Sequence, residues 1–165
     1  MYARTTKLCS AAFLAAGLIL SAAPSAQAQT TMAAVMPNGV VKVKSAYGVA
    51  ETVERLKKDI AAKGIMFFQE VDQAKLAAGA GINLRASTLL MFGDPPLGTQ
   101  FMTANPDAGL DWPVRLLVTQ DAGGQVWTTY TDFGWIARRH GIETRDAQFK
   151  MASDVIASIT SSVAK

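Results

Sequence analysis

The strongest constraint on the fold is a pair of segments, residues 114–118 and 126–131, whose side chains follow a two-residue period. They lie on either side of a compact turn at residues 121–124. β-forming side chains occupy every second position of each segment, which predicts two strands with one buried face. The turn reads Asp-Ala-Gly-Gly, which is typical of a tight connection between antiparallel neighbours. The three segments together predict a β-hairpin.

Three more segments, residues 41–44, 65–71 and 88–92, are rich in β-forming side chains and predict further strands. A short, Ala-rich and weakly helical segment follows the second of them at residues 75–80. Strands that are neighbours along the chain usually pair with each other. We therefore expect an α+β fold in which an antiparallel sheet carries its helices on one face.

Two long helices are expected in this fold. Apolar residues recur three and four positions apart between Val49 and Ile60, which predicts an amphipathic helix that Gly64 ends. A second apolar stripe covers residues 149–163, and Thr144 is the expected cap of that helix. The expected order of main elements is thus β-α-β(4)-α.

The N-terminus has the pattern of a secretory signal peptide. Two basic residues precede an apolar run at residues 11–20, and Ala26-Gln27-Ala28 then provides small residues for cleavage. We expect cleavage after Ala28, a periplasmic or secreted protein, a flexible linker at residues 29–38 and a single domain at residues 39–165. The apolar run is too short to span a bilayer, and no later segment predicts a membrane span in the mature chain.

Cleavage at this site changes the charge of the protein. The whole chain has 16 Lys and Arg residues and 13 Asp and Glu residues, so loss of Arg4 and Lys7 leaves 14 against 13, a net charge of +1. A charge this small predicts no nucleic-acid partner. The single cysteine, Cys9, also lies in the signal peptide, so the mature chain is expected to have no disulfide and no thiol nucleophile.

The connection at residues 93–112 is long for a loop inside a compact domain, which indicates a function or structure of its own. Thr99 and Asp107 are the expected caps of two short helices within it. Pro113 disfavours the helical conformation at Trp112, so the chain is expected to extend again there and enter the next strand.

This connection opens with the motif Phe-Gly-Asp-Pro-Pro-Leu-Gly-Thr at residues 92–99. Its two glycines lie five positions apart, as in a phosphate-binding loop, but no lysine follows the second glycine. Pro95 and Pro96 lack backbone N–H donors, and Asp94 adds a negative charge where a phosphate would bind. We therefore interpret the motif as a rigid turn.

Several motifs, in this order, resemble the family called domain of unknown function 302. They are Val-Asp-Gln at residues 71–73, Ala-Ala-Gly at 77–79, Thr-Leu-Leu-Met-Phe-Gly-Asp-Pro at 88–95, Gly-Thr at 98–99 and Ala-Gly-Leu-Asp-Trp-Pro-Val-Arg-Leu-Leu-Val at 108–118. The resemblance extends over about residues 41–163. It implies a single α+β domain similar to the TATA-binding-protein-like fold, often a homodimer, without an established biochemical activity.

The chain departs from this family at two positions. Gln73 stands where members commonly have His, and glutamine neither titrates nor binds transition metals well. Asp94 stands where members commonly have Asn, which adds a carboxylate to the loop.

The residues that could carry chemistry each have a structural interpretation beside a functional one. Asp72, Asp94 and Asp111 are turn or cap residues, or else converge as an acid/base or cation site. Lys75 and Arg115 pair with these aspartates or bind an anionic ligand, and His140 is a helix-end residue, or else a proton carrier or a metal ligand. We expect no cofactor and no metal. The predicted ligand pocket consists of Asp72, Lys75, Phe92, Gly93, Asp94, Pro95, Gly98, Thr99, Asp111, Arg115 and His140.

Two hypotheses for the function follow. The preferred one is a dimeric binding or interaction module, not an enzyme. Its small-molecule or protein partner contacts the loop at residues 93–99 and the residues around Asp72, Asp111 and Arg115. The alternative is a small hydrolase or lyase in which Asp94 and Asp111 act as acid and base and Arg115 or His140 stabilises charge. This alternative requires the two carboxylates to face each other across one cleft.

Overall fold

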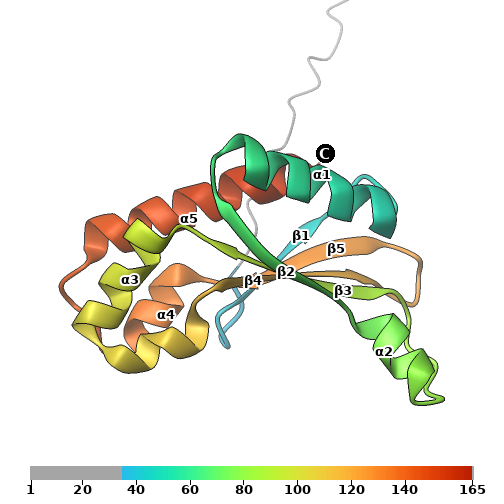
Figure 1. Cartoon of the computed structure of the whole chain (residues 1–165), viewed down its shortest axis with the longest axis horizontal. Coiled ribbons are helices and arrows are strands. Elements are labelled where there is room, and N and C mark those ends of the chain that lie inside the picture. The colour runs from blue at the N-terminus through green and yellow to red at the C-terminus, as the bar shows by residue number, and fades with distance from the viewer. Residues whose placement is uncertain (1–34, 165) are drawn as a thin grey trace, which may run out of the picture. The chain divides into compact units, whose positions relative to one another are not determined.

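The computed structural model describes residues 35–164, which form an antiparallel five-stranded sheet with helices packed on it (Figure 1). The strands lie in the order β1-β5-β4-β3-β2. They are β1 (Val40–Lys44), β2 (Met66–Asp72), β3 (Ser87–Gly93), β4 (Val114–Gln120) and β5 (Val126–Thr131). The predicted α+β fold is confirmed. The predicted signal peptide and residues 29–34 of the predicted linker lie outside the described residues.

The two main helices, α1 (Val49–Ala62) and α5 (Asp146–Ser161), pack against each other over one face of the sheet (Figure 1). Four shorter helical segments complete the described part of the chain. They are α2 (Gln73–Gly79), α3 (Pro95–Ala104), the 3₁₀ helix η1 (Pro106–Asp111) and α4 (Phe133–Arg139). Helix α2 projects beyond one end of the sheet, and α3 and α4 lie at the other end (Figure 1).

The core lies between the sheet and its helices. Side chains alternate between the two faces of a strand, so Leu90 and Phe92 on β3 point to the same side as Leu116 and Val118 on β4. All four are buried. The opposing helices bury residues at the expected spacing of three and four, which on α1 are Thr52, Val53, Leu56 and Ile60.

The predicted hairpin and the predicted end of the first helix are both confirmed. Strands β4 and β5 pair in antiparallel register around the turn, where Asp121 Oδ1 accepts hydrogen bonds from the N–H groups of Gly123 and Gln125. Gly64 follows the last turn of α1 with a φ of +68°, a conformation that glycine adopts without steric cost.

Three predicted helix caps are wrong. Helix α5 starts at Asp146 after Arg145, so Thr144 lies outside it. Helix α3 starts at Pro95, and Thr99 sits inside it with its hydroxyl donating to Pro95 O at 2.7 Å. The cap of η1 is Asn105, whose Oδ1 accepts from Asp107 N. Of the residues that precede these three helices, only Asn105 caps with its side chain, so α3 and α5 begin where the path of the chain sets them and not at a capping side chain.

The sequence indicated a helix that ends near His140 but predicted neither the start nor the cap of this helix, α4. Asp132 caps it by accepting a hydrogen bond from Trp135 N at 2.7 Å, and Phe133 and Ile136 bury its apolar side. The signal for this helix is an Asp followed by apolar residues three positions apart. His140 is its C-cap, so the interpretation of His140 as a helix-end residue is confirmed.

Candidate functional site

The motif at residues 92–99 forms the end of β3 and the first turns of α3. Pro95 and Pro96 begin the helix, where an N–H would have no partner within the helix. The next two N–H groups, from Leu97 and Gly98, donate to Asp94 O at 3.1 and 2.8 Å. None of the first four residues of α3 therefore has a free backbone N–H group that could bind an anion.

Both glycines of the motif contact the indole ring of Trp112. A Cβ atom at Gly93 would lie 2.9 Å from Trp112 Nε1, and one at Gly98 would overlap the same ring. The indole therefore covers a part of the backbone where only glycine fits. The spacing that resembles a phosphate-binding loop is explained by this packing.

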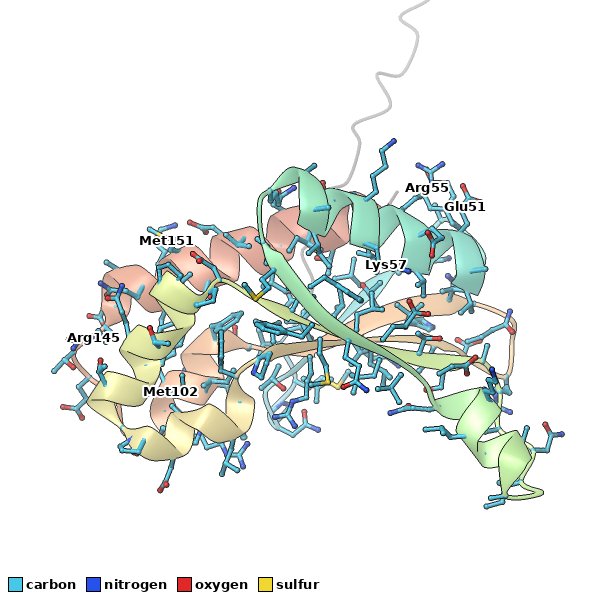
Figure 2. The ribbon with its side chains drawn as sticks, in the orientation of Figure 1. Glu51, Arg55, Lys57, Met102, Arg145 and Met151 are labelled. Atoms are coloured by element: carbon cyan, nitrogen blue, oxygen red, sulfur yellow. The ribbon has the colours of Figure 1, made fainter. Side chains whose placement is uncertain are left out.

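A cavity of about 500 Å³ opens beside the motif, between β3, β4, α3, α5 and the end of α1. Its wall is mostly apolar and includes the aromatic rings of Phe92, Phe101, Trp112 and Phe133. Met151, labelled on α5 in Figure 2, contributes to the same wall. Phe101 stacks on Phe149 of α5 with ring centroids 4.2 Å apart, so α3 is held against α5 at this place.

Three charged residues also line this cavity, and two of them have partners. Lys63 Nζ lies 2.6 Å from Asp59 Oδ2, and Asp154 Oδ2 lies 2.6 Å from Lys150 Nζ. The third, Asp94, is exposed, and its carboxylate forms no hydrogen bond or ion pair with any other part of residues 35–164. Asp94 thus contributes the one uncompensated charge that the described residues place on this cavity.

A separate polar cluster surrounds Asp111, whose side chain is only 6% exposed. Its carboxylate accepts hydrogen bonds from Arg115 at 3.3 Å and Arg139 at 3.1 Å, and contacts His140 Nε2 at 2.7 Å. Arg115 also donates to Leu110 O, and His140 O accepts from Asn105 Nδ2. The cluster joins η1 and the start of β4, which are neighbours along the chain, to Arg139 at the end of α4, 28 positions after Asp111.

Comparison with known proteins gives the chain a family. The model of the family described as Domain of unknown function DUF302 matches residues 41–161. The chain belongs to this family. A crystal structure of an uncharacterized conserved DUF302 protein from Bacillus stearothermophilus has the same fold, with a TM-score of 0.69 and 15% identity over 76% of this chain and 98% of that chain.

Curated relatives of this DUF302 chain are longer. Over 111 residues, which are 67% of the chain, it is 39% identical to proteins named Fluoride-specific ion channel FluC 1 in Brucella suis biovar 1 and FluC 2 in Brucella melitensis biotype 1. The match covers 44% and 41% of those proteins, so the chain spans less than half of their length. Within residues 35–164, no helix has the length and apolar character needed to cross a bilayer.

The residues predicted for the DUF302 pocket fall into three places. Phe92, Gly93, Asp94 and Gly98 line the large cavity, with Pro95 and Thr99 in the adjoining turns of α3. Asp111 and Arg115 line a second, smaller cleft, and His140 belongs to the same polar cluster. Asp72 and Lys75 lie at the start of α2, where Asp72 Oδ1 caps the helix by accepting from Lys75 N at 2.8 Å.

Asp72, Asp94 and Asp111 therefore occupy different surroundings. No group of three or more His, Cys, Asp or Glu side chains suited to a metal ion occurs within residues 35–164. Gln73 accepts a hydrogen bond from Ser87 Oγ at 2.7 Å and so ties α2 to β3.

Sequence reasoning missed two groups of residues in this DUF302 structure. Trp112, Lys63 and Met151 line the cavity although they lie outside the motif, and Arg139 joins the Asp111 cluster. For Trp112 a signal existed, because one large aromatic residue and two nearby glycines can fit together. The other residues reach their positions through helix packing alone.

Proposed function

We propose that this DUF302 domain is a binding module for a small, mainly apolar molecule held in the cavity beside residues 92–99. The observation that carries the proposal is the cavity itself, whose volume of about 500 Å³ falls within the usual range of ligand pockets. Its apolar, aromatic wall is typical of such pockets. The match to part of much longer Brucella proteins adds support, since it is what a module used in different chains would give.

The alternative, an acid/base enzyme with Asp94 and Asp111, has less support from the geometry. Asp94 lines the large cavity and Asp111 lines the smaller cleft. The Asp111 carboxylate is already engaged by Arg115, Arg139 and His140, so its oxygens serve as acceptors within the fold. A binding function needs neither residue as a proton carrier.

Filling the cavity tests the proposal. Ala152 lines the cavity on α5, and a leucine there would remove about 50 Å² of apolar contact from a ligand, worth roughly tenfold in affinity. We expect Ala152→Leu to weaken the binding of N-phenyl-1-naphthylamine, a neutral apolar dye, by about that factor in a fluorescence titration. The matched variant Ala157→Leu, at an exposed position of the same helix, should bind like the wild type.

The proposal fails if wild-type protein does not bind the dye, or if both leucine variants bind it with unchanged affinity. Thermal unfolding of each variant shows whether the fold is retained.

We further propose that the domain works outside the cytoplasm as a homodimer. The signal-peptide pattern at residues 1–28 supports export. Strand β2 supports pairing, because it lies at the edge of the sheet and exposes three consecutive apolar residues, Met66, Phe67 and Phe68. An exposed apolar edge strand offers unpaired backbone groups to a second chain.

A further inference from the structure

We propose that the cavity selects molecules in which an apolar body carries a cationic amine, with Asp94 as the counter-ion of the amine. This inference rests on the proposed binding function and names its ligand class. It is drawn from three properties of the cavity, namely its wall, its charge and the helix start beside it.

The wall determines the body of the ligand. Aromatic and aliphatic side chains from four different elements, such as Phe92, Phe101, Val114 and Val155, make up most of it. Each Å² of apolar surface that a ligand buries against such a wall contributes about 25 cal/mol, and a buried polar group without a partner would cost free energy. A hydrocarbon chain or ring is therefore favoured as the part that enters the cavity.

The charge determines the head group. Of the three charged residues that line the cavity, Lys63 and Asp154 are each 2.6 Å from an opposite charge on their own helix or its end. Asp94 has no such partner within residues 35–164. Opposite charges attract more strongly beside an apolar wall than in bulk water. An ammonium group on the ligand would supply the partner that Asp94 lacks.

The start of α3 disfavours the opposite choice, an anionic head. Helix N-termini usually bind anions through free N–H groups. Here Pro95 and Pro96 have no N–H, and the N–H groups of Leu97 and Gly98 donate to Asp94 O. An anion at the start of α3 would meet the Asp94 carboxylate, and the backbone of residues 95–98 would offer it no free N–H group.

The test compares three molecules with the same eight-carbon chain, namely octylammonium, 1-octanol and octanoate. Their affinities are measured at pH 7 and low salt, below their micellar concentrations, by displacement of N-phenyl-1-naphthylamine. We expect octylammonium to bind about threefold to fivefold more tightly than 1-octanol, as for a partly exposed ion pair, and octanoate to bind least tightly. About 0.5 M salt should reduce the differences.

Asp94→Asn should abolish the preference for octylammonium and leave the affinity for 1-octanol unchanged. The Asp94 carboxylate makes no cap hydrogen bond, so the substitution removes no contact within residues 35–164 and the fold should be retained, which urea unfolding checks. The matched control Asp107→Asn changes an exposed aspartate at the start of η1, away from the cavity, and should keep the preference.

The outcomes separate this inference from the proposed function. Equal binding of the three molecules, tighter binding of octanoate, or a preference that survives in Asp94→Asn would overturn the amine selectivity and leave the binding module in place. If none of the three molecules displaces the dye and the dye itself does not bind, the binding function fails as well.

Discussion

At the scale of single residues, the contact between Trp112 and the two glycines of the 92–99 motif explains why this motif has its composition. Gly98 lies inside α3, where glycine costs up to about 1 kcal/mol relative to alanine. The position keeps glycine because a side chain would overlap the indole. The same indole forms part of the cavity wall, so packing and the proposed function depend on one contact.

Gly98→Ala should therefore destabilise the protein although alanine is the better helix former. Forcing an extra carbon into a packed site costs about 1 to 3 kcal/mol, which exceeds the helix-propensity gain. The change is measured as a lower midpoint of urea unfolding. Gly79→Ala is the matched control, since nothing lies within 4 Å of the added Cβ, and its midpoint should stay equal or rise. An unfolding midpoint of Gly98→Ala at or above wild type would show that the indole moves away without cost.

At the scale of elements, the β4–β5 hairpin is held by a charged side chain at its turn. Trp127 Nε1 donates to Asp121 Oδ2 at 2.8 Å, and the N–H groups of Gln125 and Gly123 donate to Oδ1. The Trp127 hydrogen bond is the main reason why the pKa of Asp121 lies below its ordinary value of 3.8. The ionised carboxylate is thus favoured by the folded hairpin.

The hairpin should therefore lose stability in acid. Because the pKa of Asp121 is lower in the folded protein than in the unfolded chain, its contribution is present above pH 3.8 and is lost as the pH falls below that value. Asp121→Asn keeps an acceptor oxygen but cannot titrate. We expect the difference in unfolding free energy between wild type and Asp121→Asn to shrink between about pH 6 and about pH 2.5 in urea titrations. A difference that stays constant over this range would contradict the assignment.

At the scale of the whole molecule, the helices cover one face of the sheet and leave the edge at β2 open (Figure 1). Met66 is 52% exposed, although it is a large apolar residue in a strand. Natural proteins usually protect such edges with charged side chains or by pairing them. Pairing with a second copy along β2 would also bury Phe67 and Phe68.

Native mass spectrometry of protein purified from its source tests export and pairing together. We expect the mass of a dimer of two chains that each begin at Gln29. Met66→Lys should give a monomer, because a charge at the edge opposes pairing. Leu110→Lys, at another exposed apolar residue, should remain a dimer. A wild-type monomer would contradict the pairing, and an intact Met1 would contradict the cleavage.

Much of the fold could be predicted from local patterns in the sequence. The patterns that predicted it involve residues close together along the chain, so a short stretch of sequence contains each whole pattern. They are the alternation at residues 114–118, the spacing of three and four in α1, and the glycine that ends this helix. For the same reason the hairpin turn at Asp121 was predictable. The helix caps were less predictable. Thr144 is a residue type that often caps, yet α5 begins one residue later, after Arg145, whose side chain makes no cap hydrogen bond.

The candidate site depended on contacts between distant residues. Trp112 packs against Gly93, 19 positions away along the chain, and His140 contacts Asp111, 29 positions away. Sheet pairing and helix packing bring these residues together. The sequence indicated that the connection at residues 93–112 was unusual and identified its family. Whether Asp94 faced a cavity, and whether Asp111 had partners, was decided by the tertiary structure, since burial and charge compensation exist only after distant side chains have packed.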